Sequence, residues 1–435
     1  MMAGALVGLV ALAAAACGSS GSSSGGSGGA VTLKIISWVN PPANQAFKKI
    51  DAEFEKKYPN IKVQYQLAAN TAGPYETLLQ TTVDSHSADI VTTNTPFQPL
   101  PPNATRATES TEQFWSTHDV FEPLNGQPWL KNFTPSALAS ETYNGKTYGI
   151  LTGEYQWVVF YNKTDFAKYH VSVPHTYSQF LSVLQTFKSK GLVPLWLGLG
   201  GGASGYAQQF MTEPLMSELW QPQVAGQNLA AALQNGSTTW TNPAFVTAMT
   251  EEAQIAKYLE PSYTGVSWEG MPGAFAANKS PMLLDGSWDM ASVQSANPNI
   301  KVGSFAFPGS NDPTMNQPLV ADDLTLEVLK AAPEKAAALK WMSFFASKPI
   351  YQQYVDITGI SPSQSGGTYS SFSSQVLGPL FGKGINTTTI FPTLPATEGY
   401  NDTTANFPLL QLAVMSGSKT PAAAAQAYQG DWKKP

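Results

Sequence analysis

The chain has 435 residues, which is enough for two or three lobes that each bury a stable core. Only 12% of the residues are charged and the formal net charge is −6, which argues against a nucleic-acid partner because phosphate binding depends on clustered Lys and Arg. The 11 Trp, 17 Tyr and 21 Phe belong mostly to cores, but flat amphipathic rings also bind the apolar faces of sugars.

The N-terminus predicts export and anchoring. Residues 1–17 form an apolar signal-peptide core that ends at Cys17, the only cysteine, and residues 18–30 form a Gly/Ser-rich tether. This layout resembles a bacterial lipoprotein signal, in which Cys17 would become the lipidated first residue. Two departures are the lack of a preceding Lys or Arg and the small Ala14. The alternative is a plain secretory signal or a truncated start.

The first folded segment has a βαβαβ order, which favours a parallel sheet with right-handed crossovers. Ligands gather beyond the carboxyl ends of strands in such sheets, so Trp38 and Asn94 become candidates. A strand-capping or turn role is the alternative for each. The region 99–120 is rich in Pro, Thr and Asn and predicts a surface loop. The predicted strands are Val31–Trp38, Ile61–Tyr65 and Ala88–Val91, with helices around Phe47–Tyr58 and Tyr75–Val83.

A central stretch predicts a passage between two packed layers. Asn144-Gly145 indicates a tight hairpin turn, because a primed turn needs positive φ at both central residues. The run Trp157–Tyr161 is continuously apolar, as in a strand of a parallel sheet buried on both faces. Between them lies the polar break Thr152–Gln156. We interpret this break as a crossing between two lobes, and a bulge or loop within one domain is the alternative.

The later elements alternate helices and short buried strands. Thr176–Gln179 is a capping box, and Asn242-Pro243 begins another helix. A tight glycine turn at Gly286 presents Trp288. Asp322 and Asp323 fall at the start of a predicted strand within Leu319–Leu329. The other predicted elements are strands Val193–Leu197, Met282–Asp285 and Val302–Phe307, a helix opened by Pro333, and helical segments within Phe407–Tyr428.

The order of these motifs resembles the extracellular solute-binding proteins of ABC importers, specifically the maltose-binding-like, carbohydrate-associated family. The similarity covers nearly the whole chain from Val31 to Tyr428. The motifs that carry it are the lipoprotein-like start, Phe54–Val63, Asn144-Gly145-Lys146 leading to Tyr161-Asn162-Lys163, Asn278-Lys279 to Trp288, and Thr420-Pro421-Ala422.

The resemblance implies an α/β, two-lobed periplasmic-binding-protein-like fold, in which each lobe is a mainly parallel sheet flanked by helices. Crossing segments would fall near Leu151–Glu154, Phe305–Pro308 and Ser347–Ile350. The implied limits are 31–151 plus 308–348 for the N-terminal lobe and 152–307 plus 349–435 for the C-terminal lobe.

The resemblance also implies where a ligand would bind. Tyr155 would stand where the crossing strand meets the cleft, and Trp288 would offer an aromatic platform. For both, filling of the core is the alternative, and for Trp38, Trp196 and Tyr400 it is the favoured interpretation. Asp289 and Asp322 could instead cap a turn or helix. The implied ligand-binding residues are Trp288, Tyr155, Asn94, Trp38, Trp196, Asp289, Asp322 and Tyr400.

The implied function is the capture of a sugar or oligosaccharide between the lobes for delivery to a membrane permease, with no enzymatic activity, metal or cofactor. The protein would act as a monomer, lipid-anchored through Cys17 on the extracytoplasmic face. Rival classes are a glycoside hydrolase and a surface carbohydrate receptor without transport. The four histidines are scattered, which argues against a metal site. The hydrolase would need a carboxylate pair, but spacing selects none from Glu154, Asp285, Asp289, Asp322 and Asp323.

Overall fold

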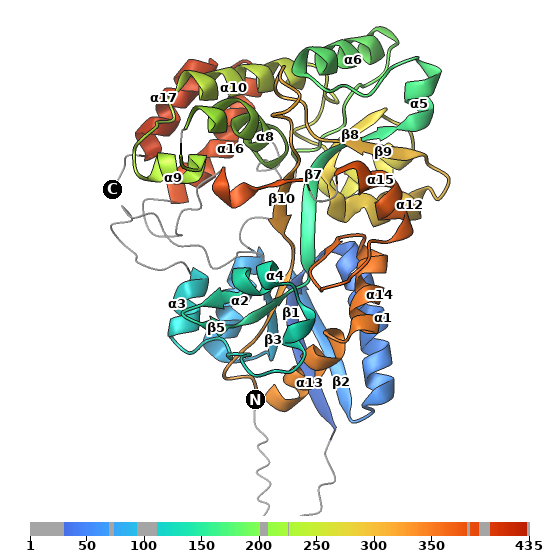
Figure 1. Ribbon diagram of the computed structural model, residues 1–435, viewed down its shortest axis with the longest axis vertical. Helices are drawn as coiled ribbons and strands as arrows, with labels where there is room; N and C mark the ends of the chain where they lie inside the picture. The colour runs from blue at the N-terminus through green and yellow to red at the C-terminus, as the bar shows by residue number, and fades with distance from the viewer. Residues whose placement is uncertain are drawn as a thin grey trace, which may run out of the picture.

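The computed structural model describes residues 30–68, 74–93, 111–200, 208–224, 226–380, 383–390 and 401–432. It has two lobes stacked along the long axis, each with a sheet flanked by helices (Figure 1). Cys17, the tether before residue 30, Asn94 and Tyr400 lie outside the described residues. No helix in the described part of the chain is both long and apolar enough to cross a bilayer.

The first lobe contains a five-stranded sheet in the order β2-β1-β3-β11-β6. The strands β1, β2 and β3 are parallel, as the βαβαβ order predicted, and β11 is antiparallel to both β3 and β6. The bounds are β1 (Val31–Trp38), β2 (Ile61–Ala68), β3 (Ile90–Thr93), β6 (Gly149–Leu151) and β11 (Thr325–Val328).

Local sequence signals explain several elements of this lobe. The Asn40 side chain accepts a hydrogen bond from the backbone N–H of Ala43 and begins α1. Asn144 and Gly145 have φ of 49° and 73°, so the predicted hairpin forms between β4 (Thr142–Tyr143) and β5 (Lys146–Thr147). The predicted loop 99–120 was wrong where it is described, because residues 111–117 form a helix. The helices are α1 (Pro41–Lys57), α2 (Pro74–Ser85), α3 (Thr111–Thr117), α4 (Pro135–Ser140), α13 (Lys335–Phe345) and α14 (Lys348–Thr358).

The second lobe contains a six-stranded sheet centred on the long strand β7. β7 is antiparallel to β8, β9, β10 and β12, and only β10 and β13 pair in parallel. The expectation of a mainly parallel sheet in this lobe was therefore wrong. The bounds are β7 (Gly153–Asn162), β8 (Met282–Gly286), β9 (Val302–Phe305), β10 (Leu319–Asp322), β12 (Ser361–Pro362) and β13 (Ile385–Asn386).

Helices cover the faces of this second sheet (Figure 1). The Thr176 side chain accepts from the N–H of Gln179 and caps α6, and Asn242 caps α10, as predicted. The predicted strand Val193–Leu197 forms only isolated bridges, from Leu195 to Leu259 and from Trp196 to Leu283. The helices are α5 (Lys163–Lys168), α6 (Tyr177–Ser189), α8 (Glu213–Leu215), α9 (Leu229–Gln234), α10 (Pro243–Ala256), α11 (Met271–Ala276), α12 (Met290–Ala296), α15 (Ser371–Leu377), α16 (Asn401–Met415) and α17 (Pro421–Trp432).

The chain passes between the lobes at three neighbouring places. The first passage is at Thr152, between β6 and β7, where it was predicted. The second is at Asp323-Leu324, between β10 and β11, and Asp323 donates its N–H to the carbonyl of Gly153. The third follows Ile360, where β12 pairs with the start of β7. Figure 1 shows β7 and β10 running from one lobe into the other.

The other two predicted crossings, near Phe305–Pro308 and Ser347–Ile350, were misplaced. Phe305, Phe307 and Leu319 belong to the hydrophobic core of the second lobe. The apolar residues of 350–360 belong to the core of the first lobe, where Tyr354 packs against Phe47 and Phe345. The reason is that residues 308–322 lead into β10, which pairs with β7, whereas α14 packs against α1.

Candidate functional site

The candidate site lies where β7 leaves the first lobe. Side chains alternate along a strand, so Tyr155 and Trp157 share one face of β7. Their ring centroids are 6.3 Å apart. Tyr155 is opposite Ala321 of β10, one residue pair beyond the second passage. Trp157 is buried, with 4% of its surface exposed, whereas Tyr155 is only partly buried.

Trp288 stands on a turn that the second lobe brings to the same place. β8 ends at Gly286, which pairs with Trp157, and a 3-10 turn follows at Ser287–Asp289. The Ser287 hydroxyl accepts a hydrogen bond of 3.0 Å from the backbone N–H of Gln156, which fixes the turn against β7. The partly buried Trp288 ring meets Tyr155 edge to face, with centroids 4.6 Å apart and planes at 90°.

Phe210 completes the group of rings. It lies in a π-helical turn, Gln208–Thr212, a rare geometry that is frequent at functional sites. Its ring is 5.9 Å from Trp288 and 6.2 Å from Trp157. We call Tyr155, Trp157, Phe210 and Trp288 the aromatic cluster. Trp157 and Phe210 are buried, and Tyr155 and Trp288 are partly buried.

Several carboxyl groups lie near Tyr155, on both faces of the β7–β10 pair. Glu154 of β7 is opposite Asp322 of β10, and Asp323 follows. Burial raises the pKa of Asp323 to about 7, and burial together with the Glu154 charge raises the pKa of Asp322 to about 6. Burial also raises the pKa of Glu154. The pKa of Tyr155 is raised by burial first and then by the charges of Asp323, Glu213 and Asp322, so carboxyls of the second passage and of the second lobe act on this ring.

Asp285 and Asp289 form a buried pair beneath the Trp288 turn. Asp289 is 4% exposed and Asp285 is fully buried. Burial and the neighbouring carboxyl raise the pKa of Asp285, and burial raises that of Asp289 to about 7. Asp285 also accepts a hydrogen bond of 2.8 Å from the N–H of Gly286. Asp289 is the last residue of this turn, and its burial does not favour the predicted direct contact with a ligand.

The predicted site residues separate into two groups. Tyr155, Trp288 and Asp322 come together at the passage between the lobes. Trp38 lies in the core of the first lobe, edge to face with Tyr75, and Trp196 lies in the core of the second lobe. Both were placed by strand ends, which do not reveal the face on which a side chain lies.

Sequence reasoning missed Trp157 and Phe210 and did not include Asp323 or Glu213 among the ligand-binding residues. The sequence could have predicted that Trp157 lies beside Tyr155, because side chains two residues apart on a strand lie on the same face. Phe210 had no local signal, because only the tertiary fold brings its helical turn to β7. Within the described ranges, no group of three or more His, Cys, Asp or Glu side chains is arranged to hold a metal ion.

Comparison with known proteins matches this chain to a protein family. A family model described as bacterial extracellular solute-binding protein matches residues 39–352. The multiple sugar-binding protein of Streptococcus mutans is 25% identical over 326 residues, covering 72% of this chain and 70% of that protein. The melibiose/raffinose/stachyose-binding protein MelE of Bacillus subtilis is 22% identical over 348 residues, covering 76% and 73%.

A solved structure supports the same architecture. RafE in complex with raffinose superposes with a TM-score of 0.71 at 19% identity, covering 92% of this chain and all 100% of that one. This likeness shows the two-lobed fold.

Proposed function

Because this chain belongs to the bacterial extracellular solute-binding protein family, we propose that it is the substrate-binding component of an ABC transporter and captures a sugar or oligosaccharide between its lobes. The names of its relatives support this, since two of them are described as binding sugars. Two further relatives, both from Pyrococcus horikoshii, are described as ABC transporter extracellular-binding proteins.

The observation that carries the proposal is the pair of partly buried rings, Tyr155 and Trp288, beside the three passages. A sugar has apolar C–H faces that pack on aromatic rings and hydroxyls that need polar partners. Trp288 and Tyr155 offer aromatic rings for the C–H faces, and the planes of these two rings are at right angles to each other. Asp322 and Glu154, both partly buried, pair across β10 and β7 next to the passages, on the sheet face opposite to Tyr155, and offer oxygen acceptors there. Losing one buried hydrogen bond to a hydroxyl costs about 1–3 kcal/mol, and such losses would set specificity.

The mechanism we propose is hinge bending about the three passages. We infer that one lobe comprises the described residues within 31–151 and 325–360 and the other those within 153–322 and 361–432, each moving as a unit. A ligand that contacts both lobes binds the closed form more tightly and shifts the population toward it. The closed, loaded protein would then dock on the permease. We expect it to do so as a monomer.

We propose that the chain binds its ligand without converting it. Its relatives are described as binding proteins, which favours this over a glycoside hydrolase. Incubation with chromogenic glycosides should release no product above the rate of a heat-denatured sample. Product formation that follows the folded protein would establish an enzyme.

Location outside the cytoplasm follows the family description, and attachment through a lipid on Cys17 is our proposal. Mass spectrometry of the N-terminal peptide should then find diacylglyceryl-modified Cys17. The Cys17→Ser variant should be recovered in the soluble extracytoplasmic fraction. Membrane retention of that variant would contradict lipid anchoring.

A thermal-shift screen over mono- and oligosaccharides tests the central proposal. A ligand at about 100 times its dissociation constant adds roughly 2.7 kcal/mol to the free energy of unfolding, which raises the melting temperature. Titration calorimetry on each hit should give one site per chain. The absence of a shift with every sugar, together with a shift from a non-carbohydrate solute, would reject a sugar ligand and retain a solute-binding protein.

A further inference from the structure

Two buried hydroxyl groups meet at the first passage between the lobes. The Tyr351 hydroxyl of α14 donates a hydrogen bond of 2.7 Å to the carbonyl of Thr152. The Ser363 hydroxyl, just after β12, donates one of 2.6 Å to the carbonyl of Leu151. The two hydroxyl oxygens lie 2.8 Å apart. None of these four residues exposes more than 4% of its surface, so water does not replace a lost partner.

The three contacts between these oxygens share only two protons. A hydroxyl carries one proton, and a carbonyl only accepts. While each hydroxyl donates to its carbonyl, no proton remains for the contact between Tyr351 and Ser363. If the Tyr351 O–H turns to the Ser363 oxygen instead, the carbonyl of Thr152 is released and both hydroxyls still donate. The pair therefore has two arrangements with the same number of donated hydrogen bonds.

Both hydroxyls are attached to the first lobe. Tyr351 lies in α14, which packs against α1 (Figure 1). Ser363 follows the third passage but keeps hydrogen bonds to the first lobe. Its carbonyl accepts from the N–H of Thr134 at 2.9 Å, and its N–H donates to the Tyr351 hydroxyl at 2.6 Å. The hydroxyl pair is therefore fixed relative to the first lobe.

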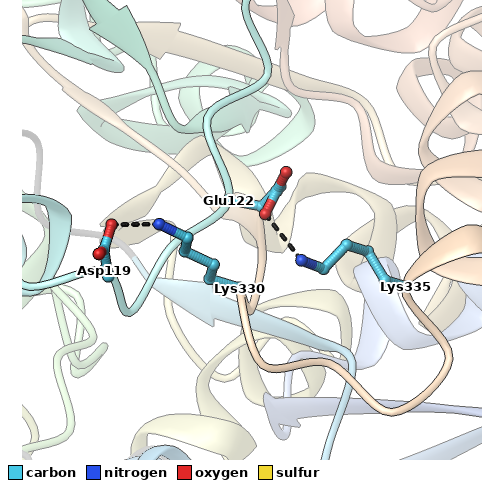
Figure 2. A network of polar contacts seen from close by, with 4 residues as sticks. All are labelled: Asp119, Glu122, Lys330 and Lys335. Atoms are coloured by element: carbon cyan, nitrogen blue, oxygen red, sulfur yellow. Dashed lines mark hydrogen bonds and ion pairs between the residues drawn. The ribbon is translucent and has the colours of Figure 1, made fainter.

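The strand β11, which follows the second passage, is also held at its far end. There the N–H of Lys330 donates to the carbonyl of Val120 at 2.8 Å. Figure 2 shows two ion pairs at the same end, of Lys330 with Asp119 and of Lys335 with Glu122, the second at 2.9 Å. Since β11 also pairs with β3 and β6, the first lobe forms one frame, and rotation between the lobes falls at the passages.

Of the groups that the two hydroxyls contact, the Thr152 carbonyl is the one on the peptide that joins the lobes. Thr152 precedes Gly153, the first residue of β7, and its own N–H donates to the carbonyl of Leu324 in the second passage. Rotation of β7 against the first lobe turns the peptide between Thr152 and Gly153. The direction of the Thr152 carbonyl therefore changes with the angle between the lobes.

We infer that Tyr351 and Ser363 are positioning residues of the hinge, and that the Tyr351 O–H turns between the Thr152 carbonyl and the Ser363 hydroxyl as the lobes rotate. This inference rests on the hinge bending of the proposed function and names residues that set its balance. In the present arrangement the Tyr351 hydroxyl holds the first passage. In the other, the carbonyl is free to turn and no buried hydroxyl loses its acceptor, which would be costly.

Substitutions of the two residues have opposite expected effects. In Ser363→Ala, the Thr152 carbonyl is the one acceptor of this group that remains for the Tyr351 O–H, so the first passage is held in one arrangement. In Tyr351→Phe, the carbonyl has lost its donor and the first passage is free to rotate. Loss of packing or of stability alone would loosen both variants in the same direction.

Distances between the lobes in the full-length protein without ligand provide the test. Nitroxides on Lys49→Cys of the first lobe and Lys190→Cys of the second, both exposed positions, are compared by double electron–electron resonance in a Cys17→Ser background. The population of a second lobe arrangement should rise up to about 10-fold in Tyr351→Phe, as the loss of one hydrogen bond allows. In Ser363→Ala the distance distribution should narrow. Ser363→Thr, which keeps a hydroxyl, should resemble the parent protein.

Two buried hydroxyls of the second lobe, away from the passages, supply matched controls. Tyr177 donates to Gln254 at 3.0 Å, and Ser280 donates to the carbonyl of Met282 at 2.7 Å. Tyr177→Phe and Ser280→Ala should lower stability in urea denaturation and leave the distance distribution unchanged.

Distributions that stay unchanged in both hinge variants, or that broaden in both, overturn the inference. If Tyr351→Phe does not fold, Ser363→Ala decides alone, because narrowing supports the inference and any other result rejects it. Sugar binding is measured separately by thermal shift, so these results leave the proposed function standing. If no solute binds, the proposed function fails, and the distances without ligand still test the hydroxyl pair.

Discussion

Trp288 holds its position because the residue two places before it has no side chain. A Cβ on Gly286 would lie 2.0 Å from the Trp288 ring, so the ring folds back over its own strand end only when this residue is glycine. The ring then meets Tyr155 edge to face, the arrangement that aromatic pairs prefer. The position of the Trp288 ring thus depends on Gly286 in its own turn and on Tyr155 of the neighbouring strand β7.

The first prediction concerns the Trp288 ring. Trp288→Ala should weaken binding of the best sugar about 30-fold or more, because a stacked ring acts as an anchor, and it should lower stability only modestly. Titration calorimetry and thermal unfolding separate the two effects. The control is Trp196→Phe, in the core of the second lobe, which should lower the free energy of unfolding by about 1–3 kcal/mol and leave affinity nearly unchanged. Unchanged affinity with lowered stability in Trp288→Ala would assign that ring to the core.

At this scale the structure brings some of the predicted residues together and separates others, and their contact with a ligand stays a prediction. Tyr155 and Asp322 lie on polar breaks next to apolar runs, and such breaks mark where strands leave a packed layer. Trp38 and Trp196 were placed by strand ends alone, with filling of the core as the favoured interpretation, and both rings lie in the cores. The physical reason is that strand position along the chain is local information, whereas the face that becomes buried depends on what packs against it.

Among the elements, the run Leu319–Leu329 is the most informative. Its apolar alternation predicts one strand, yet β10 pairs with β7 of the second lobe and β11 pairs with β3 and β6 of the first. Asp322-Asp323 is the polar break at which the chain changes lobes, as Thr152 is in the β6–β7 segment. The two breaks lie side by side, because Thr152 donates its N–H to the carbonyl of Leu324.

The second prediction tests how tightly the passages pack. A Cβ on Gly153 would lie 2.4 Å from Ile360 Cδ1 and 2.5 Å from the carbonyl oxygen of Ser361. Gly153→Ala should therefore lower the free energy of unfolding by about 1–3 kcal/mol, the usual cost of overpacking. Urea denaturation measures this loss.

The matched control is Gly273→Ala in helix α11, where a Cβ would meet nothing within 4 Å. It should leave stability unchanged or raise it by up to about 1 kcal/mol, because Ala favours helix over Gly. Equal stability of the two variants would contradict close packing at the third passage.

For the whole molecule, the notable feature is the number of buried carboxyls in both lobes. Burial raises the pKa of Glu141 and Glu252 to about 8 and that of Asp289 and Asp323 to about 7. Each therefore keeps its proton in the folded protein at a pH where the unfolded chain has lost it. The stabilising contribution is complete below about pH 4, the ordinary value in the unfolded chain, and is lost as the pH rises through 7 to 8.

The third prediction follows from this linkage. The free energy of unfolding should fall between pH 5 and pH 8, by at most about 1.4 kcal/mol per pH unit for each such group. Chemical denaturation at half-unit intervals measures the slope. Glu252→Gln should flatten it, because the uncharged amide replaces a carboxyl held by Thr212 and Gln411. Asp356→Asn replaces an exposed carboxyl and should leave the slope of the free energy of unfolding against pH unchanged. Stability that rises over this range would contradict the assignment.

The sequence by itself determined the order of helices and strands in most of the chain, the Asn144-Gly145 hairpin, and the helix caps at Thr176 and Asn242. These depend on backbone preference and on partners a few residues away. Only the tertiary structure decided that the second sheet is mainly antiparallel, that the later passages lie at Asp323 and after Ile360, and that Phe210 joins the cluster. Those features depend on which distant strand or helix packs beside each segment, and that choice is set by the burial of the whole core.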